Sequence, residues 1–202
     1  MSEVILLSGG VESTTLLHMQ YTQSELHPVF IDYGQRAAMQ EYQAAKAQCI
    51  QLGLTLKKLD MAQTGHDFRE GQSQKLHVPL PHRNLIALSL GLSYATQINA
   101  ERVFLALNLE DTQAYPSASD AFIAQFQALA HILGNVKIAT PLRTHTKAHI
   151  IQQGVRLGVD YHTTYSCLLG YPLHCGHCPQ CKHRIAAFKA AGISERPELY
   201  RA

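Results

Sequence analysis

A pattern suited to anion binding lies near the N-terminus. Ser8, Gly9 and Gly10 stand between an apolar run and a pattern typical of a helix, and hydroxyl residues follow at positions 13–15. Backbone N–H groups at the start of a helix lack partners, and the helix dipole presents its positive end there. Paired glycines let the backbone approach a ligand closely, while the hydroxyls add donors. The loop therefore predicts a phosphate site, with a plain strand-to-helix turn and serine cap as the alternative.

A second chemical cluster lies near the C-terminus, where four of the five cysteines gather. Cys175, Cys178 and Cys181 recur at every third position, and Cys167 precedes them. Thiolates at this spacing chelate zinc, and four of them leave no open coordination position, so the zinc would be structural. An iron–sulfur cluster or a redox pair is the alternative, because similar spacings also hold iron. Cys49 falls in an alanine-rich helical pattern and is predicted to be a core residue.

The elements that position these clusters alternate between strand and helix patterns. Strand patterns cover residues 4–7, 27–32, 54–59, 102–107 and 136–139. Helical patterns cover residues 14–23, 37–52, 83–98, 121–133 and 147–157. This alternation predicts an α/β fold with a doubly wound, mostly parallel five-stranded sheet and helices on both faces. In such folds ligands bind beyond the carboxyl ends of the strands, where the Ser8 and Asp32 loops lie.

Two segments depart from the alternation. Periodicity is lost over residues 61–81, which predicts an irregular excursion, either a lid or an ordinary surface loop, with prolines making 78–81 extended. Cys, His, Gly and Pro become dense after residue 160. We therefore expect an α/β domain over residues 1–160, and a small metal-binding appendage over 161–202 with a C-terminal helix packed on it.

Composition narrows the class of protein. The chain has 202 residues, 46% of them apolar and 16% charged, which is typical of a globular domain with a substantial core. The formal net charge is +2 and basic residues do not cluster, so a nucleic-acid partner is not expected. The sequence shows no secretory leader pattern and no apolar run of about 18 residues. We expect a cytoplasmic protein without a membrane partner.

Several motifs together resemble a known family. The two commonest phosphate loops are excluded, because no lysine follows the glycines and no Gly-x-Gly-x-x-Gly occurs. The Ser-Gly-Gly-x-Glu-Ser pattern at 8–13 resembles the loop of PP-loop ATP pyrophosphatases instead. The later motifs follow the order of the 7-cyano-7-deazaguanine synthase (QueC) family over nearly the whole chain: Asp32-Tyr33-Gly34-Gln35-Arg36, Pro81-x-Arg83-Asn84, Asp111-x3-Tyr115-Pro116, Thr140-Pro141-Leu142 with Lys147-Ala148, and the four cysteines with Arg184.

This resemblance implies an ATP-dependent ligase that forms C–N bonds. Its substrates would be 7-carboxy-7-deazaguanine and ammonia, and its product the nitrile 7-cyano-7-deazaguanine, a precursor of queuosine. ATP would adenylate the carboxylate, ammonia would displace AMP to give an amide, and a second adenylation would permit elimination to the nitrile. The resemblance also implies Mg²⁺, one structural Zn²⁺ and a homodimer.

The resemblance assigns roles to individual residues. Those for the nucleotide are Leu7, Ser8, Gly9, Gly10, Val11, Glu12, Ser13, Thr14, Thr15, Leu16, Leu17, Asp32 and Arg36. Catalytic roles fall on Glu12, Ser13, Arg83 and Lys147. Contacts with the substrate are expected from Asn84, Asn108, Asp111, Tyr115 and Arg143, although for Arg143 a surface salt bridge is the alternative. The zinc ligands are Cys167, Cys175, Cys178 and Cys181.

The chain also departs from the family pattern. Glu12 replaces the usual Asp, which moves the carboxylate outward by one methylene. The family's Tyr-Pro-Asp-Cys-Arg segment is Tyr-Pro-Ser-Ala-Ser at 115–119, which removes a carboxylate and a guanidinium from a region expected to face the substrate. His82 stands where the family has glycine, and the loop before Pro81 is shorter.

These departures leave three other hypotheses. A diverged ligase would adenylate the same acid and join it to another amine, such as a protein terminus, giving an amide. A nucleotide-binding subunit would have little or no activity. A sulfur-transfer relative that acts on tRNA would need a catalytic cysteine pair beside the metal set, and Cys49 is the sole cysteine left over.

Overall fold

The computed structural model describes residues 1–72 and 80–201 and contains one parallel sheet in the order β3-β2-β1-β4-β5. The strands are β1 (Ser2–Leu6), β2 (Glu25–Asp32), β3 (Lys57–Asp60), β4 (Arg102–Phe104) and β5 (Lys137–Ala139). The helices are α1 (Val11–Gln20), α2 (Ala38–Gln51), α3 (Ala62–Arg69), α4 (Arg83–Gln97), α5 (Leu109–Ala114), α6 (Asp120–Gly134), α7 (Lys147–Arg156) and α8 (Pro179–Ala191). The doubly wound parallel fold is confirmed.

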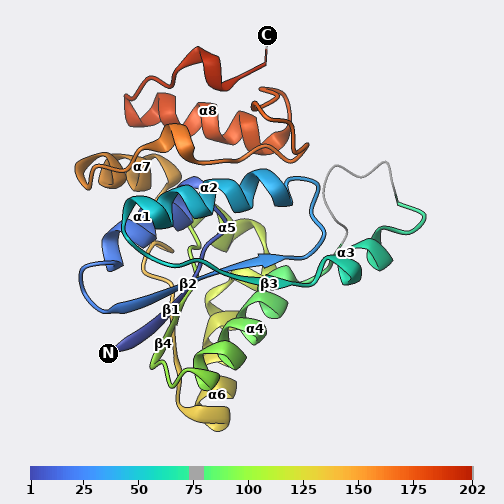
Figure 1. Ribbon diagram of the computed structural model, residues 1–202, viewed down its shortest axis with the longest axis vertical. Helices are drawn as coiled ribbons and strands as arrows, with labels where there is room; N and C mark the ends of the chain where they lie inside the picture. Colours follow the sequence, from blue (N-terminus) through green and yellow to red (C-terminus); the bar gives the residue numbers. More distant parts are fainter. Residues whose placement is uncertain (73–79, 202) are drawn as a thin grey trace.

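Strand β1 divides the core into two layers. Val4 and Leu6 pack on one face with residues of α4 and α6, whereas Ile5 and Leu7 pack on the other with residues of α1, α2 and α7. This alternation follows from the two-residue period of a strand that is buried on both faces. Figure 1 shows α4 and α6 on one side of the sheet and α1, α2 and α7 on the other. Cys49 lies in the second layer at 1% exposure, as predicted.

A third layer is formed by α8, which stacks on α7 (Figure 1). The side chain of Arg184 in α8 is fully buried. Its Nε donates to Glu195 Oε1 at 2.8 Å, and its Nη1 donates to Thr164 Oγ1 at 2.9 Å. Further bonds run to Ser166 Oγ at 3.2 Å and to the carbonyl oxygen of Tyr161 at 2.9 Å. One guanidinium therefore ties the chain on both sides of α8 to the helix.

The prediction of an irregular excursion from residue 61 is wrong for residues 62–69, which form α3. Asp60 Oδ1 accepts a hydrogen bond from the Ala62 N–H at 3.0 Å, which forms a turn just before the N-cap of the helix, Met61. Gly65 marked a break in the pattern, yet a Cβ atom there would lie 1.7 Å from the carbonyl oxygen of Tyr33. The glycine is thus required by close packing and does not mark a loop. Residues 78 and 79 of the predicted extended segment lie outside the described residues.

The strand predicted over residues 102–107 is too long, because β4 ends at Phe104. The Leu107 N–H donates to the carbonyl oxygen of Leu105 at 3.2 Å, a tight turn that ends the ladder. Helix α5 follows and was not predicted. Asn108 Oδ1 accepts from the Asp111 N–H at 2.7 Å, and Asp111 Oδ2 accepts from the Asn108 N–H at 3.2 Å, which together form a capping box. Among the described residues, no helix has the length and apolar character needed to span a membrane.

Candidate active site

The phosphate loop, residues 8–13, joins the end of β1 to the start of α1. Gly9 has φ +76°, and a Cβ atom there would lie 2.5 Å from the carbonyl oxygen of Glu41, so conformation and space both require glycine. Ser13 Oγ accepts from the Ser8 N–H at 3.2 Å and lies 3.0 Å from Ser8 Oγ. The N-cap of α1 is Gly10, which has no side chain to cap the helix. The predicted serine-cap alternative is therefore wrong, and the first turn of α1 suits an anion.

Residues from three motifs meet beside this loop. Glu12 Oε1 lies 2.9 Å from Lys147 Nζ and accepts a hydrogen bond from Asn108 Nδ2 at 2.8 Å. Asn108 is held by Asp111 through the capping box of α5. Burial raises the pKa of Glu12, but the charge and hydrogen bond of Lys147 outweigh it, so the net pKa lies below its usual value. Glu12 is therefore a carboxylate at neutral pH, paired with an ammonium group.

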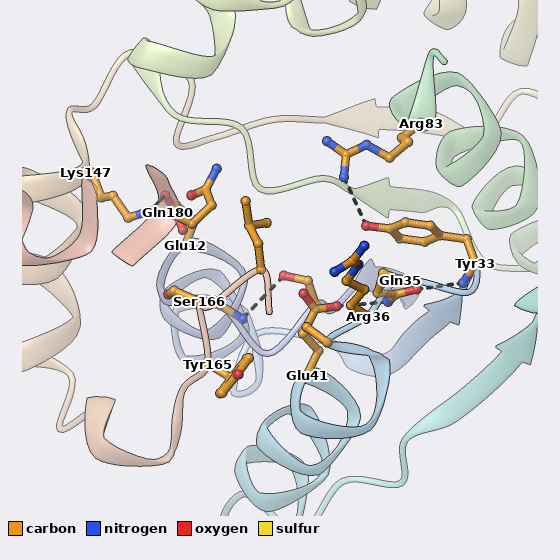
Figure 2. A pocket seen from close by; sticks show the side chains of 14 residues that line it. Glu12, Tyr33, Gln35, Arg36, Glu41, Arg83, Lys147, Tyr165, Ser166 and Gln180 are labelled. Carbon is orange, nitrogen blue, oxygen red and sulfur yellow. Dashed lines mark hydrogen bonds and ion pairs between the residues drawn. The ribbon is translucent and has the colours of Figure 1, made fainter. Parts of the chain in front are cut away.

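The opposite wall comes from the loop after β2 and from the starts of α2 and α4 (Figure 2). Arg83 Nη1 donates to Tyr33 Oη at 3.1 Å, and Gln35 Nε2 donates to Glu41 Oε2 at 2.9 Å. Burial raises the pKa of Glu41 to about 7, although the bond from Gln35 and the charge of Arg83 act to lower it. Arg36 lines the same wall. This wall combines two guanidinium groups with a carboxyl group that titrates near neutrality.

Three cavities open around the phosphate loop, and Ser8 and Gln180 line all of them. The loop cavity, of about 190 Å³, lies between the Glu12–Lys147 pair and Glu41. The strand-end cavity, of about 310 Å³, is bounded by the ends of β1, β2 and β4 and by the start of α4. The helix cavity, of about 680 Å³, lies among α5, α7 and α8. Ligands in neighbouring cavities would meet at Ser8.

Among the residues that line these cavities, sequence reasoning singled out neither Glu41 nor Gln180. Glu41 lies inside a helix that the pattern predicted, but no motif distinguished it from other polar residues there. Gln180 stands between Cys178 and Cys181 at the start of α8. The cysteine spacing could have indicated Gln180, because two thiols that bind one metal ion also fix the orientation of a residue that lies between them.

The four clustered cysteines are free thiols whose sulfur atoms all lie within 4.8 Å of one another. Thiolates around one metal with bonds of about 2.3 Å lie roughly 3.8 Å apart in a tetrahedron, and Cys175 Sγ lies 3.9 Å from Cys181 Sγ. Burial raises the pKa of Cys175, but hydrogen bonds from the N–H groups of Cys178 and His177 lower it to about 7. The donor set and its spacing fit a tetrahedral metal ion, and they do not identify the metal.

Comparison with known proteins places the chain. The family profile described as Queuosine biosynthesis protein QueC matches residues 2–192. The chain is 34% identical over 197 residues to the 7-cyano-7-deazaguanine synthase 1 of Sulfurisphaera tokodaii, covering 96% of each protein. It is 36% identical over 222 residues to the 7-cyano-7-deazaguanine synthase of Saccharophagus degradans, covering 98% of this chain and 96% of the relative. This chain belongs to the QueC family.

More distant solved structures share the fold of this QueC family member. The NH3-dependent NAD synthetase from Campylobacter jejuni has a TM-score of 0.56 at 16% identity and covers 80% of this chain and 66% of its own. The U34-tRNA thiolase NcsA from Methanococcus maripaludis, solved with its [4Fe-4S] cluster, has a TM-score of 0.53 at 16% identity, covering 94% of this chain and 64% of its own. At this identity the likeness shows the fold alone.

Several residues that the QueC pattern assigned to the nucleotide have side chains in the core. Val11, Leu16 and Leu17 are fully buried, so they could contact a ligand through the backbone alone. Thr15 Oγ1 donates to the carbonyl oxygen of Val11 at 2.9 Å and lies 2.6 Å from Tyr161 Oη. Thr14 is likewise fully buried. These side chains fix α1 behind the loop.

Two other predicted residues lie apart from the cavities. Asp32 Oδ2 lies 2.8 Å from Lys58 Nζ, and Asp32 Oδ1 caps the turn at Gly34. Arg143 Nη1 lies 2.6 Å from Asp120 Oδ1 in an exposed pair, which matches the salt-bridge alternative. Neither Asp32 nor Arg143 is among the residues that line the three cavities. The QueC motif order therefore groups residues that the fold separates.

Proposed function

We propose that this QueC family member is a 7-cyano-7-deazaguanine synthase that adenylates 7-carboxy-7-deazaguanine with ATP and uses ammonia as the nitrogen donor. The observation that carries the proposal is the meeting of three cavities at Ser8, beside the Glu12–Lys147 pair. Adenylation requires a nucleotide phosphate and an acceptor carboxylate side by side. The names of the curated relatives supply the substrate class.

The strand-end cavity suits the adenosine part of ATP. Backbone and apolar side chains at the ends of three parallel strands form its floor, including Leu7, Phe30 and Leu107. Such a crevice at a reversal of strand order is the usual ligand site of a doubly wound fold. A nucleotide lying there would direct its phosphates at Ser8 and Ser13, where the start of α1 favours negative charge. When bound, Mg²⁺ would neutralise the phosphates, and Glu12 is the carboxylate that we propose to hold it.

Lys147 and Arg83 would stabilise the charge that develops during adenylation. Lys147 lines both the loop cavity and the helix cavity, whereas Arg83 lines the loop cavity and the strand-end cavity. A substrate carboxylate that attacks the α-phosphate would therefore have a cation on each side. Fixed cations at this point lower the barrier because they need little reorganisation when charge moves to the departing pyrophosphate. A carboxylate resists attack by ammonia until its oxygen becomes part of a good leaving group such as AMP.

We infer that the cysteine cluster holds a structural zinc ion, since four thiolates leave no position for substrate. The zinc ion would order residues that line the cavities and would not contact the substrate itself. The metal ligands Cys178 and Cys181 flank Gln180, whose side chain lines all three cavities. Tyr165 and Ser166, just before the ligand Cys167, line the loop cavity. Metal binding would thus order residues on two sides of the catalytic space.

The altered segment at 117–119 does not argue for a different reaction. The Ser117 carbonyl accepts a hydrogen bond from Asn84 Nδ2 at 3.1 Å, and Ser119 Oγ caps α6 by accepting from the Phe122 N–H at 3.2 Å. Residues 117–119 are not among those that line the three cavities. Asn84 and Tyr115, which were expected to contact the substrate, line the strand-end cavity, where they would contact the nucleotide instead. An amide-forming ligase is therefore left as an outcome of the test.

The decisive experiment is incubation with ATP, Mg²⁺ and 7-carboxy-7-deazaguanine, with and without ammonia, followed by mass analysis of every product. We expect AMP, pyrophosphate and the nitrile when ammonia is present. An amide that never proceeds to nitrile would support the diverged ligase. Absence of AMP under all conditions would contradict adenylation and support a nucleotide-binding subunit. A parallel reaction with the family substrate omitted controls for ATP hydrolysis.

A further inference from the structure

Glu41 occupies a place that the adenylation chemistry does not use. It lines the loop cavity and the strand-end cavity, on the wall opposite the Glu12–Lys147 pair (Figure 2). Its Oε2 accepts from Gln35 Nε2 at 2.9 Å, and Gln35 Oε1 accepts from the Tyr33 N–H at 2.9 Å. The carboxyl group is therefore held in a fixed direction by a relay of hydrogen bonds from the loop after β2.

The other carboxylates of these cavities already have partners. Glu12 pairs with Lys147, Asp111 belongs to the capping box of α5, and Glu110 accepts from the backbone N–H of Lys147. Glu41 differs, because among the described residues it forms no salt bridge within 4.0 Å and receives an uncharged amide on one oxygen. Burial accordingly raises its pKa. Hydrogen-bond donors on a ligand would complete its environment.

The two expected ligands, ATP and the deazaguanine acid, differ in the hydrogen-bonding edge of their rings, and this difference decides which of them Glu41 can bind. An ionised carboxylate is an acceptor only, with two oxygens side by side. The pyrimidine edge of adenine alternates an amino donor with a ring-nitrogen acceptor. The corresponding edge of a 7-deazaguanine places a ring N–H beside an exocyclic amino group, so it offers two adjacent donors. A carboxylate matches the second edge and opposes the acceptor of the first.

We propose that Glu41 binds the two-donor edge of the substrate heterocycle in the loop cavity and thereby selects a 2-amino-4-oxo ring. This proposal rests on the proposed function, because it takes the deazaguanine acid as substrate. The loop cavity extends from Glu41 to Ser8 and Lys147, so a ring held at Glu41 directs its far side, which carries the carboxyl group, toward the phosphate loop. Tyr33 and Tyr165 line the same cavity and supply aromatic surfaces for the ring.

The close packing of the two walls supports this arrangement. A Cβ atom on Gly9 would lie 2.5 Å from the carbonyl oxygen of Glu41, so the phosphate loop rests directly on the first turn of α2. Recognition of the ring and presentation of its carboxyl group are therefore built on elements in direct contact. A shift of one element would displace the other, because the space between the two backbones is too small even for a Cβ atom.

The test compares Glu41→Gln with the wild-type protein, using 7-carboxy-7-deazaguanine and its analogue without the 2-amino group. Direct binding is measured by calorimetry without ATP, and KM values are measured for the acid and for ATP. We expect the wild-type protein to bind the amino compound about tenfold tighter or more than the analogue, and the variant to lose most of this preference. The KM for the acid should rise by a similar factor, while the KM for ATP stays within about twofold. Glu101→Gln makes the same change at an exposed position outside the site and serves as control.

Each contrary outcome has a defined meaning. Equal binding of the two compounds by the wild-type protein would overturn the proposal without any variant. A rise in the KM for ATP, with the acid unaffected, would assign Glu41 to the adenine and overturn it as well. If Glu41→Gln does not fold, Glu41→Asp keeps the charge but shortens the reach, and it must also weaken the acid selectively. Because binding is measured without turnover, absence of AMP formation would refute the proposed reaction and leave this test intact.

Discussion

The phosphate loop and the cysteine segment, residues 165–181, build one site in opposite ways. The hydroxyl groups of Ser8 and Ser13 in the loop form their hydrogen bonds within the loop itself. The cysteine segment instead reaches across the fold, since the Tyr165 N–H donates to the Gly9 carbonyl oxygen at 2.9 Å. Gly170, at φ +71°, packs so closely that a Cβ atom would lie 2.2 Å from the carbonyl oxygen of Arg36. The first region is locally encoded, whereas the second depends on what holds it in place.

This contrast implies that the cysteine segment supports both loops that border the candidate site. It touches the loop after β1 at Gly9 and the loop after β2 at Arg36. The four clustered thiols are not among the groups that line the three cavities, yet residues of the chain between and before them are. Substitutions in the cysteine segment should therefore lower activity indirectly, by destabilising the fold. Substitutions in the phosphate loop should lower activity and leave the fold intact.

Removal of the metal is the largest expected effect. Cys181→Ser, or exhaustive chelation, should release the metal, lower the thermal midpoint and abolish AMP formation, because metal binding energy is folding energy for such a segment. Metal content and thermal unfolding measure the result. Cys49→Ala removes the cysteine outside the cluster and should keep the metal. Full activity in a metal-free protein would break the comparison, since the segment would then need no support.

Loss of the buried guanidinium comes next. Arg184→Met leaves the carboxylate of Glu195 buried without its cation, and it also strips partners from Thr164 and the Tyr161 carbonyl. We expect unfolding in urea to show a loss of about 3–5 kcal/mol. The double variant Arg184→Met, Glu195→Gln should recover part of that loss, because no unpaired charge remains. No change in stability would show that α8 is held by the metal without Arg184.

The loop side of the comparison is tested at Lys147. Lys147→Met should lower kcat by about 10²–10³, as loss of one preorganised charge-stabilising group does. The thermal midpoint should fall less than in Arg184→Met, because Lys147 forms one ion pair, with Glu12 at the edge of a cavity, whereas Arg184 bonds four residues. Steady-state kinetics and thermal unfolding together check this separation. A collapse of the fold with Lys147→Met would show that the loop is no more local than the cysteine segment.

The titration of Glu41 should have smaller effects, which are opposite in sign for substrate binding and for protein stability. Its pKa in the folded protein is about 7, above the ordinary value of 4.5, so its charge is lost as the pH falls through 7. The KM for the acid should rise below that point, by about tenfold per pH unit at most. Stability should change the other way: the contribution of Glu41 is fully present below 4.5 and is lost as the pH rises through 7.

The pH experiment must distinguish the titration of Glu41 from the effects of other charged or titratable groups near it. Arg83, Asp32, Tyr33 and Tyr165 all interact with it electrostatically. Glu41→Gln should flatten the pH profile of the KM for the acid between 5 and 8 and remove the contribution of Glu41 from the stability profile, since Arg83 stays charged throughout and burial raises the pKa of Tyr33 above its usual value. Profiles that keep their shape in the variant would assign the titration to another group.

The same contrast explains what the sequence could predict. The phosphate loop and the order of the elements were readable because apolar runs and glycine pairs act over a few residues. Helix α3 was missed because Gly65 serves contact with Tyr33, which is distant in the chain. Glu41 and Gln180 were missed for a similar reason: their roles arise where α2 and α8 meet the loops after β1 and β2. Local patterns predict elements, whereas the site is completed by contacts between them.

The smallest expected effect is at Arg143, which the family order placed with the substrate residues. Its guanidinium lies 2.6 Å from Asp120, and both side chains are substantially exposed, at 41% and 76%. Such pairs contribute at most about 1 kcal/mol, because water screens them. Arg143→Ala should therefore leave kcat/KM within about twofold and stability within that limit, as measured by kinetics and urea unfolding. A large rise in the KM for the acid would instead show that Arg143 contacts the substrate. The sequence motif would then have identified a site residue outside the phosphate loop.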